Sequence, residues 1–444
     1  FKNGEKMTKR ISDFSIGCNY WASHAGVYMW REWKPSVIEN DLKSLSECGI
    51  GVLRVFPLWQ DFQPLTRLTG TTFSEYRMGD TPLPNAGAEK YGIDSAMIER
   101  FSQFTDIAAK YNMKLIVSLI NGWMSGRMFF PQAFSNINPV ENTEAVKWEI
   151  RFVKYFVNYF KNTECIIAWE PGNETNVLSY TEGGCRKGVF PEWVSHISDA
   201  VRSVDNTRPV LAGMHGLKLY SDGLDLAYAG EIFDVLTVHP YPAFVPHCYT
   251  DSLRSMKAKL HAASESVYYS DISGKRCLCE EIGTLCGNLG DEETVYDYLL
   301  SCTYTLWANG SAGVLWWCAH DQSNLEFAPY DWCSCERELG IIRMDGSRKK
   351  VANVFGELRD LINAAGAELP ERRRDAVCIL SRGQDNWGVA YSTDILSRQA
   401  GFNVRFADGE QAVPESEIYM MPSVCDDGVP RRTLLDILDR VKNG

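Results

Sequence analysis

Short apolar runs rich in β-branched residues alternate with longer stretches of helical period between about residue 16 and residue 362. The runs are Ile16–Trp21, Val52–Phe56, Lys114–Ile120, Cys165–Glu170, Pro209–Met214, Asp234–Pro240, Arg276–Ile282 and Gly313–Cys318. Helix candidates include Ser36–Cys48, Ser95–Tyr111, Glu144–Phe160, Glu192–Val204, Glu292–Ala308 and, after the last run, Val351–Ala364. Parallel strands joined by crossover helices show this alternation. We therefore predict an α/β fold, a (β/α)8 TIM barrel over residues 1–370.

A doubly wound parallel sheet is the competing α/β fold. It would need a glycine-rich phosphate-binding turn after its first strand, and residues 19–22, Asn-Tyr-Trp-Ala, contain no glycine. In a barrel, the loops that follow the strands carry the chemistry. Four of these loops are long and bear aromatic side chains, namely residues 57–94, 121–142, 171–191 and 319–348. We therefore expect a deep pocket at the mouth of the barrel.

The periodicity changes after about Glu371. Residues 376–380, 402–406 and 418–421 are predicted strands, and residues 387–400 and 431–441 are predicted helices. This βαββα segment, residues 371–444, lacks the further strand and helix of a flavodoxin-like unit. Either it is truncated within such a unit or it is a complete two-layer α/β subdomain, and the sequence leaves both readings open. Its place beside the barrel makes dimer or trimer contacts, and hence a homo-oligomer, an option.

Composition and charge mainly exclude certain classes of protein. A net charge of −12 without a long Lys/Arg run argues against a nucleic-acid partner. The longest uncharged run, Leu299–Ala319, is interrupted by Asn309 and Gly310, so we expect no membrane span. The 14 cysteines lack the C-x₂₋₄-C pairs of zinc sites, and we interpret them as reduced thiols. The missing zinc-site spacing predicts no bound metal. Reduced cysteines, together with the lack of a signal segment after Met7, predict a cytoplasmic protein.

Two carboxylates end strands on nearly opposite sides of the predicted barrel. Glu174 follows the fourth strand, and the pair Glu280-Glu281 ends the seventh. Strand alternation sends Glu280 and Glu281 to opposite faces, so we expect only one of them to point along the barrel axis. We expect Glu170 and Glu280 to pair with loop or helix residues. Carboxylates roughly 5 to 5.5 Å apart across a sugar allow one to attack while the other donates a proton.

The residues around these carboxylates resemble clan A glycoside hydrolases, particularly family 5, which contains cellulases, β-mannanases and β-mannosidases. The matching fragments, in chain order, are Leu53-Arg54-Val55-Phe56, Asn173-Glu174, Val238-His239-Pro240-Tyr241, Glu281-Ile282-Gly283 and Trp316-Trp317. Their order and their places on the strands carry the resemblance, which covers about residues 15–364. The C-terminal segment resembles, less specifically, the flavodoxin-like domain that follows some other clan A barrels.

The resemblance implies a retaining glycosidase that needs no cofactor, with Glu281 as the nucleophile and Glu174 as the acid/base. The physical requirements of these roles agree with that division. Glu281 must stay ionised, so it needs donors such as Arg54 and the Tyr241 hydroxyl nearby. Glu174 must hold a proton at first, so we expect apolar surroundings and the second carboxylate to raise its pKa.

Further substrate contacts follow from the same resemblance. Asn173 would bind the sugar's 2-hydroxyl, His239 would orient the region of the acid/base, and Trp317 would form the floor of the site. Many clan A enzymes place a histidine after the third strand, where this chain has none, so Asn121 or Trp123 must serve there. We interpret the remaining histidines as surface or core residues, because they form no motif with metal-ligand spacing.

The first loops favour a particular substrate class. Asn19-Tyr20-Trp21, Met29-Trp30-Arg31-Glu32-Trp33 and residues 57–62 resemble the intracellular, β-mannosidase-like branch more than secreted cellulases. We therefore predict double-displacement hydrolysis of β-mannosidic or β-glucosidic bonds in short oligosaccharides, with exo action. An endo-β-1,4-mannanase or endo-glucanase is the alternative, and a non-catalytic carbohydrate-binding barrel is the third.

Overall fold

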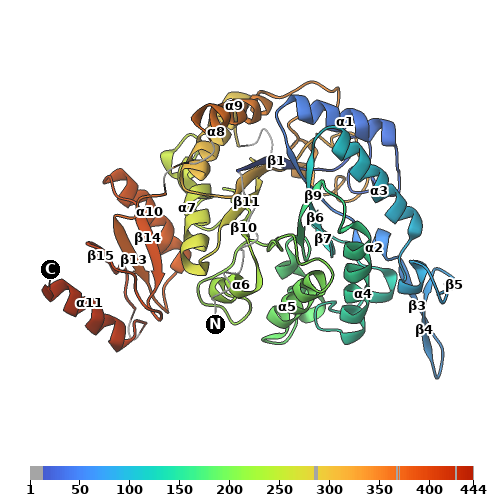
Figure 1. The fold of residues 1–444 in the computed structure, drawn as a ribbon, viewed down its shortest axis with the longest axis horizontal. Coiled ribbons are helices and arrows are strands. Elements are labelled where there is room, and N and C mark those ends of the chain that lie inside the picture. The colour runs from blue at the N-terminus through green and yellow to red at the C-terminus, as the bar shows by residue number, and fades with distance from the viewer. Residues whose placement is uncertain (1–13, 285–288, 367–368, 370, 426–427, 444) are drawn as a thin grey trace, which may run out of the picture.

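The computed structural model describes residues 14–284, 289–366, 369, 371–425 and 428–443. Within them, one curved parallel sheet has the strand order β10-β11-β12-β1-β2-β6-β9 (Figure 1). The strands are β1 (Ser15–Asn19), β2 (Val52–Val55), β6 (Lys114–Ser118), β9 (Ile166–Glu170), β10 (Leu236–Val238), β11 (Cys277–Ile282) and β12 (Gly313–Trp316). Seven of the eight predicted barrel strands are thus confirmed.

The fifth predicted strand, residues 209–214, is reduced to single bridges. Val210 bridges to Trp169 on one side, and Leu211 bridges to Val235 on the other. These bridges join β9 to the segment that leads into β10, so they complete the ring of a (β/α)8 barrel. The strand ends early because Gly213 turns the backbone to φ +62°, where a Cβ atom would lie 2.3 Å from the carbonyl oxygen of Gly172.

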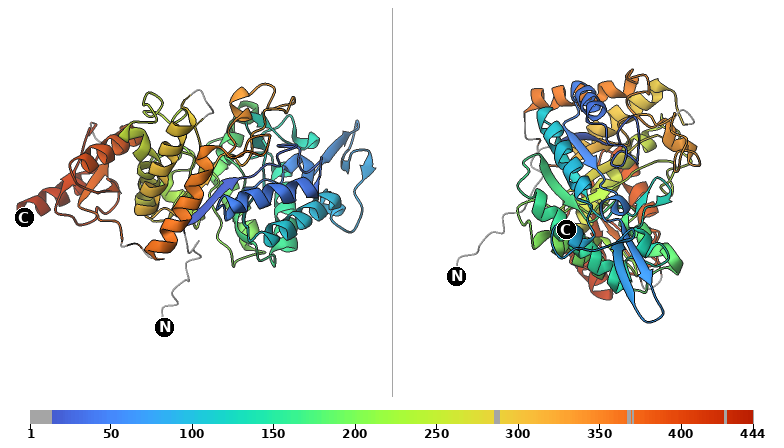
Figure 2. Two further views of the ribbon diagram at one scale, coloured as in Figure 1. Left: turned by 90° about the horizontal axis from the view of Figure 1, so that it is seen from above. Right: turned by 90° about the vertical axis from the view of Figure 1, so that its right-hand side faces the viewer.

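Helices surround the sheet on its outer side (Figures 1 and 2). They are α1 (Pro35–Glu47), α3 (Ser95–Lys110), α4 (Thr143–Phe160), α5 (Val189–Arg202), α6 (Leu226–Ile232), α7 (Met256–Ser273), α8 (Glu292–Ala308) and α9 (Asn353–Ala365). The six predicted helices are confirmed. The pattern did not predict α6 and α7. Helix α7 has no apolar stripe because its residues 261–269 are buried all round, between the barrel and the C-terminal sheet.

Two of the long loops contain strands of their own. Antiparallel strands β3 (Leu65–Thr69), β4 (Ser74–Met78) and β5 (Thr81–Pro82) project from the loop after β2, which also holds the short helix α2 (Trp59–Phe62) (Figure 1). The hairpin of β7 (Trp123–Met124) and β8 (Arg127–Met128) follows β6. This hairpin brings Trp123 to the mouth of the barrel.

The C-terminal segment forms a second parallel sheet of order β14-β13-β15, with β13 at Ala376–Leu380, β14 at Val404–Asp408 and β15 at Tyr419–Met420. Its helices are α10 (Asn386–Gln399) and α11 (Arg431–Asn443). The five predicted elements are confirmed. Arg372 forms a buried ion pair of 2.7 Å with Asp271 of α7, which ties this segment to the barrel. The predicted boundary after residue 370 falls at a residue outside the described ones and stays a prediction, as does homo-oligomerisation.

Two further observations concern the class of protein. No helix in the described ranges has the length and apolarity needed to cross a membrane. No disulfide joins the cysteines in that part of the chain. The expectations about the chain start at Met7 lie outside the described residues.

Glu149 provides a stability prediction. This carboxyl is fully buried on α4, and among the described residues only its Oε2 atom has a partner, Trp193 Nε1 at 2.7 Å. Burial raises the pKa of Glu149 from 4.5 to about 8, although the bond from Trp193 opposes the shift. The folded protein therefore binds this proton more tightly than the unfolded chain, so stability is lost as the pH rises from 4.5 to about 8.

Glu149→Gln keeps the acceptor for Trp193 and cannot ionise. We expect it to raise the melting temperature by a few degrees at about pH 9 and to have much less effect at about pH 5. Thermal unfolding at both pH values measures this difference, with the exposed Glu144→Gln on the same helix as the matched control. An equal effect of Glu149→Gln at both pH values would contradict the prediction.

Candidate active site

A cavity of about 900 Å³ opens where the barrel strands end. The predicted site residues that line it are Trp123, Asn173, Glu174, His239, Tyr241, Glu281 and Trp317. The structure thus brings these side chains together from the ends of strands and from the loops that follow them. Arg54 and Asn121 are fully buried and do not contribute to the cavity wall.

Arg54, at the end of β2, organises the carboxylates beneath the cavity. Its Nη1 atom donates to Glu281 Oε1 at 2.6 Å, its Nε atom donates to Glu170 Oε2 at 3.0 Å, and its Nη2 atom lies 3.4 Å from Glu280 Oε2. Burial acts to lower the pKa of Arg54, but the three carboxylates together raise it. Arg54 therefore supports Glu281 from below and does not line the cavity.

The expected partners of Glu170 and Glu280 were wrong. Both side chains are fully buried and pair with Arg54, and Glu280 also lies 3.3 Å from His239 Nε2. These partners belong to the barrel strands and their ends, not to loops or to the surrounding helices. Burial and the charge of Glu280 raise the pKa of Glu170 well above its ordinary value, although Arg54 opposes this. Glu170 and Glu280 thus form part of the polar layer under the site.

The prediction from strand alternation was also wrong at the end of β11. We expected only one of Glu280 and Glu281 to point inward, yet both carboxylates reach Arg54. The pairing of β11 with β12 shifts register between Cys279 and Ile282, which is a bulge. A bulge interrupts the alternation of side chains, so two consecutive residues can face the same side.

Glu281 receives two hydrogen bonds that hold its carboxylate in place. Arg54 binds Oε1 from below, and the Tyr241 hydroxyl donates to Oε2 at 2.9 Å. These are the two donors that the sequence predicted. The pKa of Glu281 is raised above its ordinary value, mainly by burial. The charges of His239 and Arg54 and the bond from Tyr241 oppose this rise.

Glu174 is positioned by its backbone as well as by its side chain. It adopts φ +44° directly after the Pro171-Gly172-Asn173 turn, and its N–H donates to the Gly213 carbonyl oxygen at 2.7 Å. The turn of Gly213 that ends the fifth strand therefore supplies the acceptor that fixes Glu174. The Trp123 Nε1 atom, on the β7–β8 hairpin, donates to Glu174 Oε2 at 3.0 Å.

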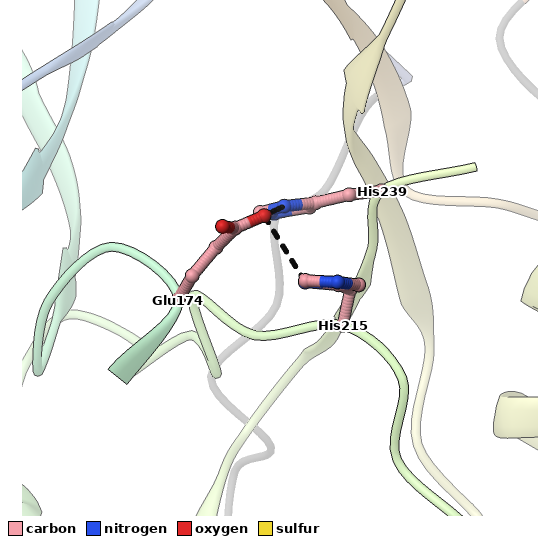
Figure 3. Close-up of side chains that lie close together, drawn as sticks. All are labelled: Glu174, His215 and His239. Carbon is pink, nitrogen blue, oxygen red and sulfur yellow. Dashed lines mark hydrogen bonds and ion pairs between the residues drawn. The ribbon is translucent and has the colours of Figure 1, made fainter. Parts of the chain in front are cut away.

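Two histidines converge on the other oxygen of Glu174 (Figure 3). His239 Nδ1 lies 2.7 Å and His215 Nδ1 lies 3.0 Å from Glu174 Oε1. The two imidazole rings are stacked, with centroids 5.2 Å apart and planes inclined by 14°. Sequence reasoning missed His215, which we interpreted as a surface or core residue. Its place just after the fifth predicted strand was the signal that could have identified it.

The predicted pKa of Glu174 had the wrong direction. Burial does act to raise it, but the charges and hydrogen bonds of His215 and His239 hold it well below its ordinary value. The pKa of His239 rises to about 10, because the carboxylates around it outweigh the opposing effect of burial. The His239 Nδ1–Glu174 Oε1 contact therefore holds a shared proton, which belongs to the pair as a whole.

His239 also sets an upper limit on the distance between the two candidate catalytic carboxylates. Its Nδ1 atom lies 2.7 Å from Glu174 Oε1 and 3.6 Å from Glu281 Oε2. The distance between Glu174 Oε1 and Glu281 Oε2 therefore cannot exceed the sum of these two distances. The two carboxylates are therefore close enough to act on one sugar held between them.

The two asparagines near Glu174 have different surroundings. Asn173 lines the cavity, and its Oδ1 atom has no hydrogen-bond partner among the described residues, so it can accept a bond from a bound molecule. Asn121 is saturated: its Nδ2 atom donates to the Pro57 and Ser118 carbonyl oxygens, and its Oδ1 atom accepts from the Asn173 N–H and the Ser118 hydroxyl. Asn121 therefore holds the turn before Glu174. Of the two candidates for the position of the family's histidine, Trp123 lines the cavity and Asn121 does not.

Trp317, after β12, completes the cavity floor. Its Nε1 atom donates to Glu336 Oε2 at 3.1 Å, which fixes the indole against the loop after β12. Burial raises the pKa of Glu336 to about 7, while its bond from Trp317 acts to lower it. Cys333 and Cys335 line the same side of the cavity.

The fold and the paired carboxylates define the chain as a glycoside hydrolase. The model of the family described as cellulase (glycosyl hydrolase family 5) matches residues 23–323, and the chain therefore belongs to glycosyl hydrolase family 5.

Relatives and solved structures agree with this family. Mannan endo-1,4-beta-mannosidase A of Hypocrea jecorina is 26% identical over 294 residues, which are 60% of this chain and 57% of that protein, so the match spans less than two thirds of the relative. An exo-beta-1,4-mannosidase from Opitutaceae bacterium strain TAV5 has a TM-score of 0.80 at 20% identity and covers 97% of this chain and 76% of its own. A GH5_18 protein from Streptomyces cattleya in complex with Manβ1-4GlcNAc has a TM-score of 0.76 at 18% identity, covering 92% and 99%. At these identities the structures show a shared fold.

Proposed function

We propose that this protein is a retaining, exo-acting β-mannosidase that removes terminal sugars from short β-linked oligosaccharides. The observation that carries the proposal is the convergence of Glu174 and Glu281 on one nitrogen atom of His239. The upper limit on the separation of their nearest oxygens favours attack by one carboxylate on the sugar itself, as in retaining glycosidases, over the wider spacing of inverting ones.

In this reaction the Glu281 carboxylate attacks the anomeric carbon and forms a glycosyl ester. The bond from that carbon to the leaving oxygen breaks, and the leaving oxygen takes the proton shared by Glu174 and His239. A water molecule then attacks the same carbon and returns a proton to the pair, which releases the sugar and restores Glu281. Arg54 and Tyr241 stabilise Glu281 each time its negative charge returns.

Exo action is supported by the loops around the cavity. The β7–β8 hairpin places Trp123 over Glu174, and the loop after β12 adds Cys333, Cys335 and Glu336 to the wall. A further part of the wall belongs to α10 of the C-terminal segment. The similarity to the exo-beta-1,4-mannosidase structure extends over 97% of this chain and therefore includes the segment that carries this wall.

Hydrolysis of 4-nitrophenyl β-mannoside and β-glucoside, together with the viscosity of a β-mannan solution, tests the proposal. We expect release from the mannoside and single-sugar products without an early fall in viscosity. A preference for the glucoside would change the assigned sugar.

An endo-β-1,4-mannanase is the second candidate, because curated relatives such as that of Hypocrea jecorina carry this name. A rapid fall in mannan viscosity, with no release from either aryl glycoside, would favour it. The cytoplasmic location predicted from the sequence remains a proposal, which fractionation of the source cells would test.

A further inference from the structure

The wall of the cavity also includes residues outside the catalytic cluster, and we call this part of the wall the α7 lobe. It is formed by Lys218 and Tyr220 of the loop after the fifth strand, Glu265, Tyr268 and Tyr269 of α7, and Gln384, Asp385 and Trp387 at the start of α10. The barrel and the C-terminal segment thus build one continuous cavity. Neither unit could form this lobe alone.

Glu265 is an acceptor without a donor in the wall of this lobe. It is 5% exposed, and its Oε2 atom has no hydrogen-bond partner within the described part of the chain. The His261 Nε2 atom lies 3.5 Å from Glu265 Oε2, and neither ring nitrogen of His261 makes a hydrogen bond within the described residues. A buried carboxylate oxygen that lines a cavity and lacks a donor is suited to a ligand hydroxyl group.

The aromatic residues of the lobe are held rigidly. The Tyr269 and Tyr268 hydroxyls accept hydrogen bonds from the Leu217 and Leu219 N–H groups, at 2.6 Å and 3.2 Å. Trp387 is half-buried, its Nε1 atom donates to the Pro246 carbonyl oxygen at 3.0 Å, and its ring stacks on Tyr391 with centroids 5.1 Å apart. A fixed indole at a cavity wall offers a flat apolar surface to a ring of C–H groups.

The lobe lies on the acid/base side of the site. His215, which binds Glu174 Oε1, also lines the cavity next to Gly216, Leu217 and Lys218. Burial lowers the pKa of His215, but the charge of Glu174 and, more weakly, that of Glu265 raise it, so Glu265 acts electrostatically on the acid/base cluster. The group that Glu174 protonates is the leaving oxygen, so the leaving part of the substrate extends towards this side.

We propose that the α7 lobe binds the sugar that departs as the leaving group, with Glu265 accepting its hydroxyl groups and Trp387 stacking on its ring. This inference rests on the function proposed above and adds the C-terminal segment to the substrate-binding machinery. It also commits the lobe to one ligand class, a polyhydroxylated pyranose, and not to an aromatic or charged aglycone.

Two substrates with the same mannosyl group and different leaving groups test the lobe. Glu265→Gln and Trp387→Ala are expected to lower kcat/KM for β-1,4-mannobiose about tenfold or more each, and kcat/KM for 4-nitrophenyl β-mannoside less than about threefold. Trp387→Phe, which keeps a flat ring, should recover most of the loss. Glu231→Gln on α6 and Leu396→Ala on α10, both exposed, are matched controls that should change neither substrate.

An equal loss on both substrates, or no loss on either, would overturn the proposal. Circular dichroism and thermal unfolding check that each variant is folded. If the wild-type protein hydrolyses neither substrate, the proposed function fails, and the lobe is then judged separately by titrating β-1,4-mannobiose against tryptophan fluorescence. A Kd raised about tenfold by Glu265→Gln would still support the lobe, whereas an unchanged Kd would overturn it.

Discussion

Glu281→Gln is expected to lower kcat on 4-nitrophenyl β-mannoside by roughly 10⁴-fold or more, because the amide cannot form the glycosyl ester. Glutamine keeps the size of the side chain and an oxygen for Arg54, so the loss should occur without a fall in melting temperature. Steady-state kinetics measures the loss. When the wild-type protein is incubated with an activated 2-deoxy-2-fluoro-β-mannoside, mass spectrometry should find the trapped sugar on Glu281.

Glu280→Gln is the matched comparison, because it neutralises the adjacent carboxylate of the same strand. It removes a partner of Arg54 and His239 but leaves the nucleophile, so we expect a loss of roughly 10² or less and continued trapping on Glu281. Both carboxylates face inward at the β11 bulge, so this comparison is needed. A trapped sugar on Glu280 would reverse the assignment.

The sequence predicted the strands whose apolar runs are continuous and failed where the backbone was shaped by the site. β2 and β6 have every residue but Lys114 buried, so their apolar runs match the strands closely. The fifth strand was predicted too long, because its last residues turn at Gly213 to support Glu174. Such a turn depends on a contact between two segments and leaves no mark in local periodicity.

The site was predictable where a motif fixes both the residue and the strand end, as for Arg54, His239 and Tyr241. It was not predictable where tertiary contacts decide the role. Asn121 is saturated by bonds within the fold, and His215 is brought to Glu174 by the truncated fifth strand. The α7 lobe needs residues that are more than a hundred positions apart, so no pattern along the chain could have indicated it.

Glu174→Ala should separate substrates by the quality of their leaving groups. With 2,4-dinitrophenyl β-mannoside, whose leaving group needs no proton, we expect little loss in kcat/KM. With β-1,4-mannobiose, we expect a loss of roughly 10² to 10⁴, because the leaving oxygen must depart without a proton. The two kcat/KM ratios, measured on the same preparation, give the contribution of the acid. An equal loss on both substrates would contradict the assigned role.

The same variant should show how the proton of the Glu174–His239 pair is used. In the wild-type protein, kcat/KM on β-1,4-mannobiose should fall at high pH as the pair loses its shared proton, and His239, with its pKa raised to about 10, places that fall in the alkaline range. Glu174→Ala should lose this alkaline limb.

Azide should restore turnover of the dinitrophenyl mannoside by Glu174→Ala, because a small anion can enter the space left by the carboxylate and attack the glycosyl ester without base assistance. Its product should be the β-mannosyl azide, since two inversions at the anomeric carbon return the original configuration. An α-azide would mean a single displacement, and it would refute Glu281 as a nucleophile together with Glu174 as its acid.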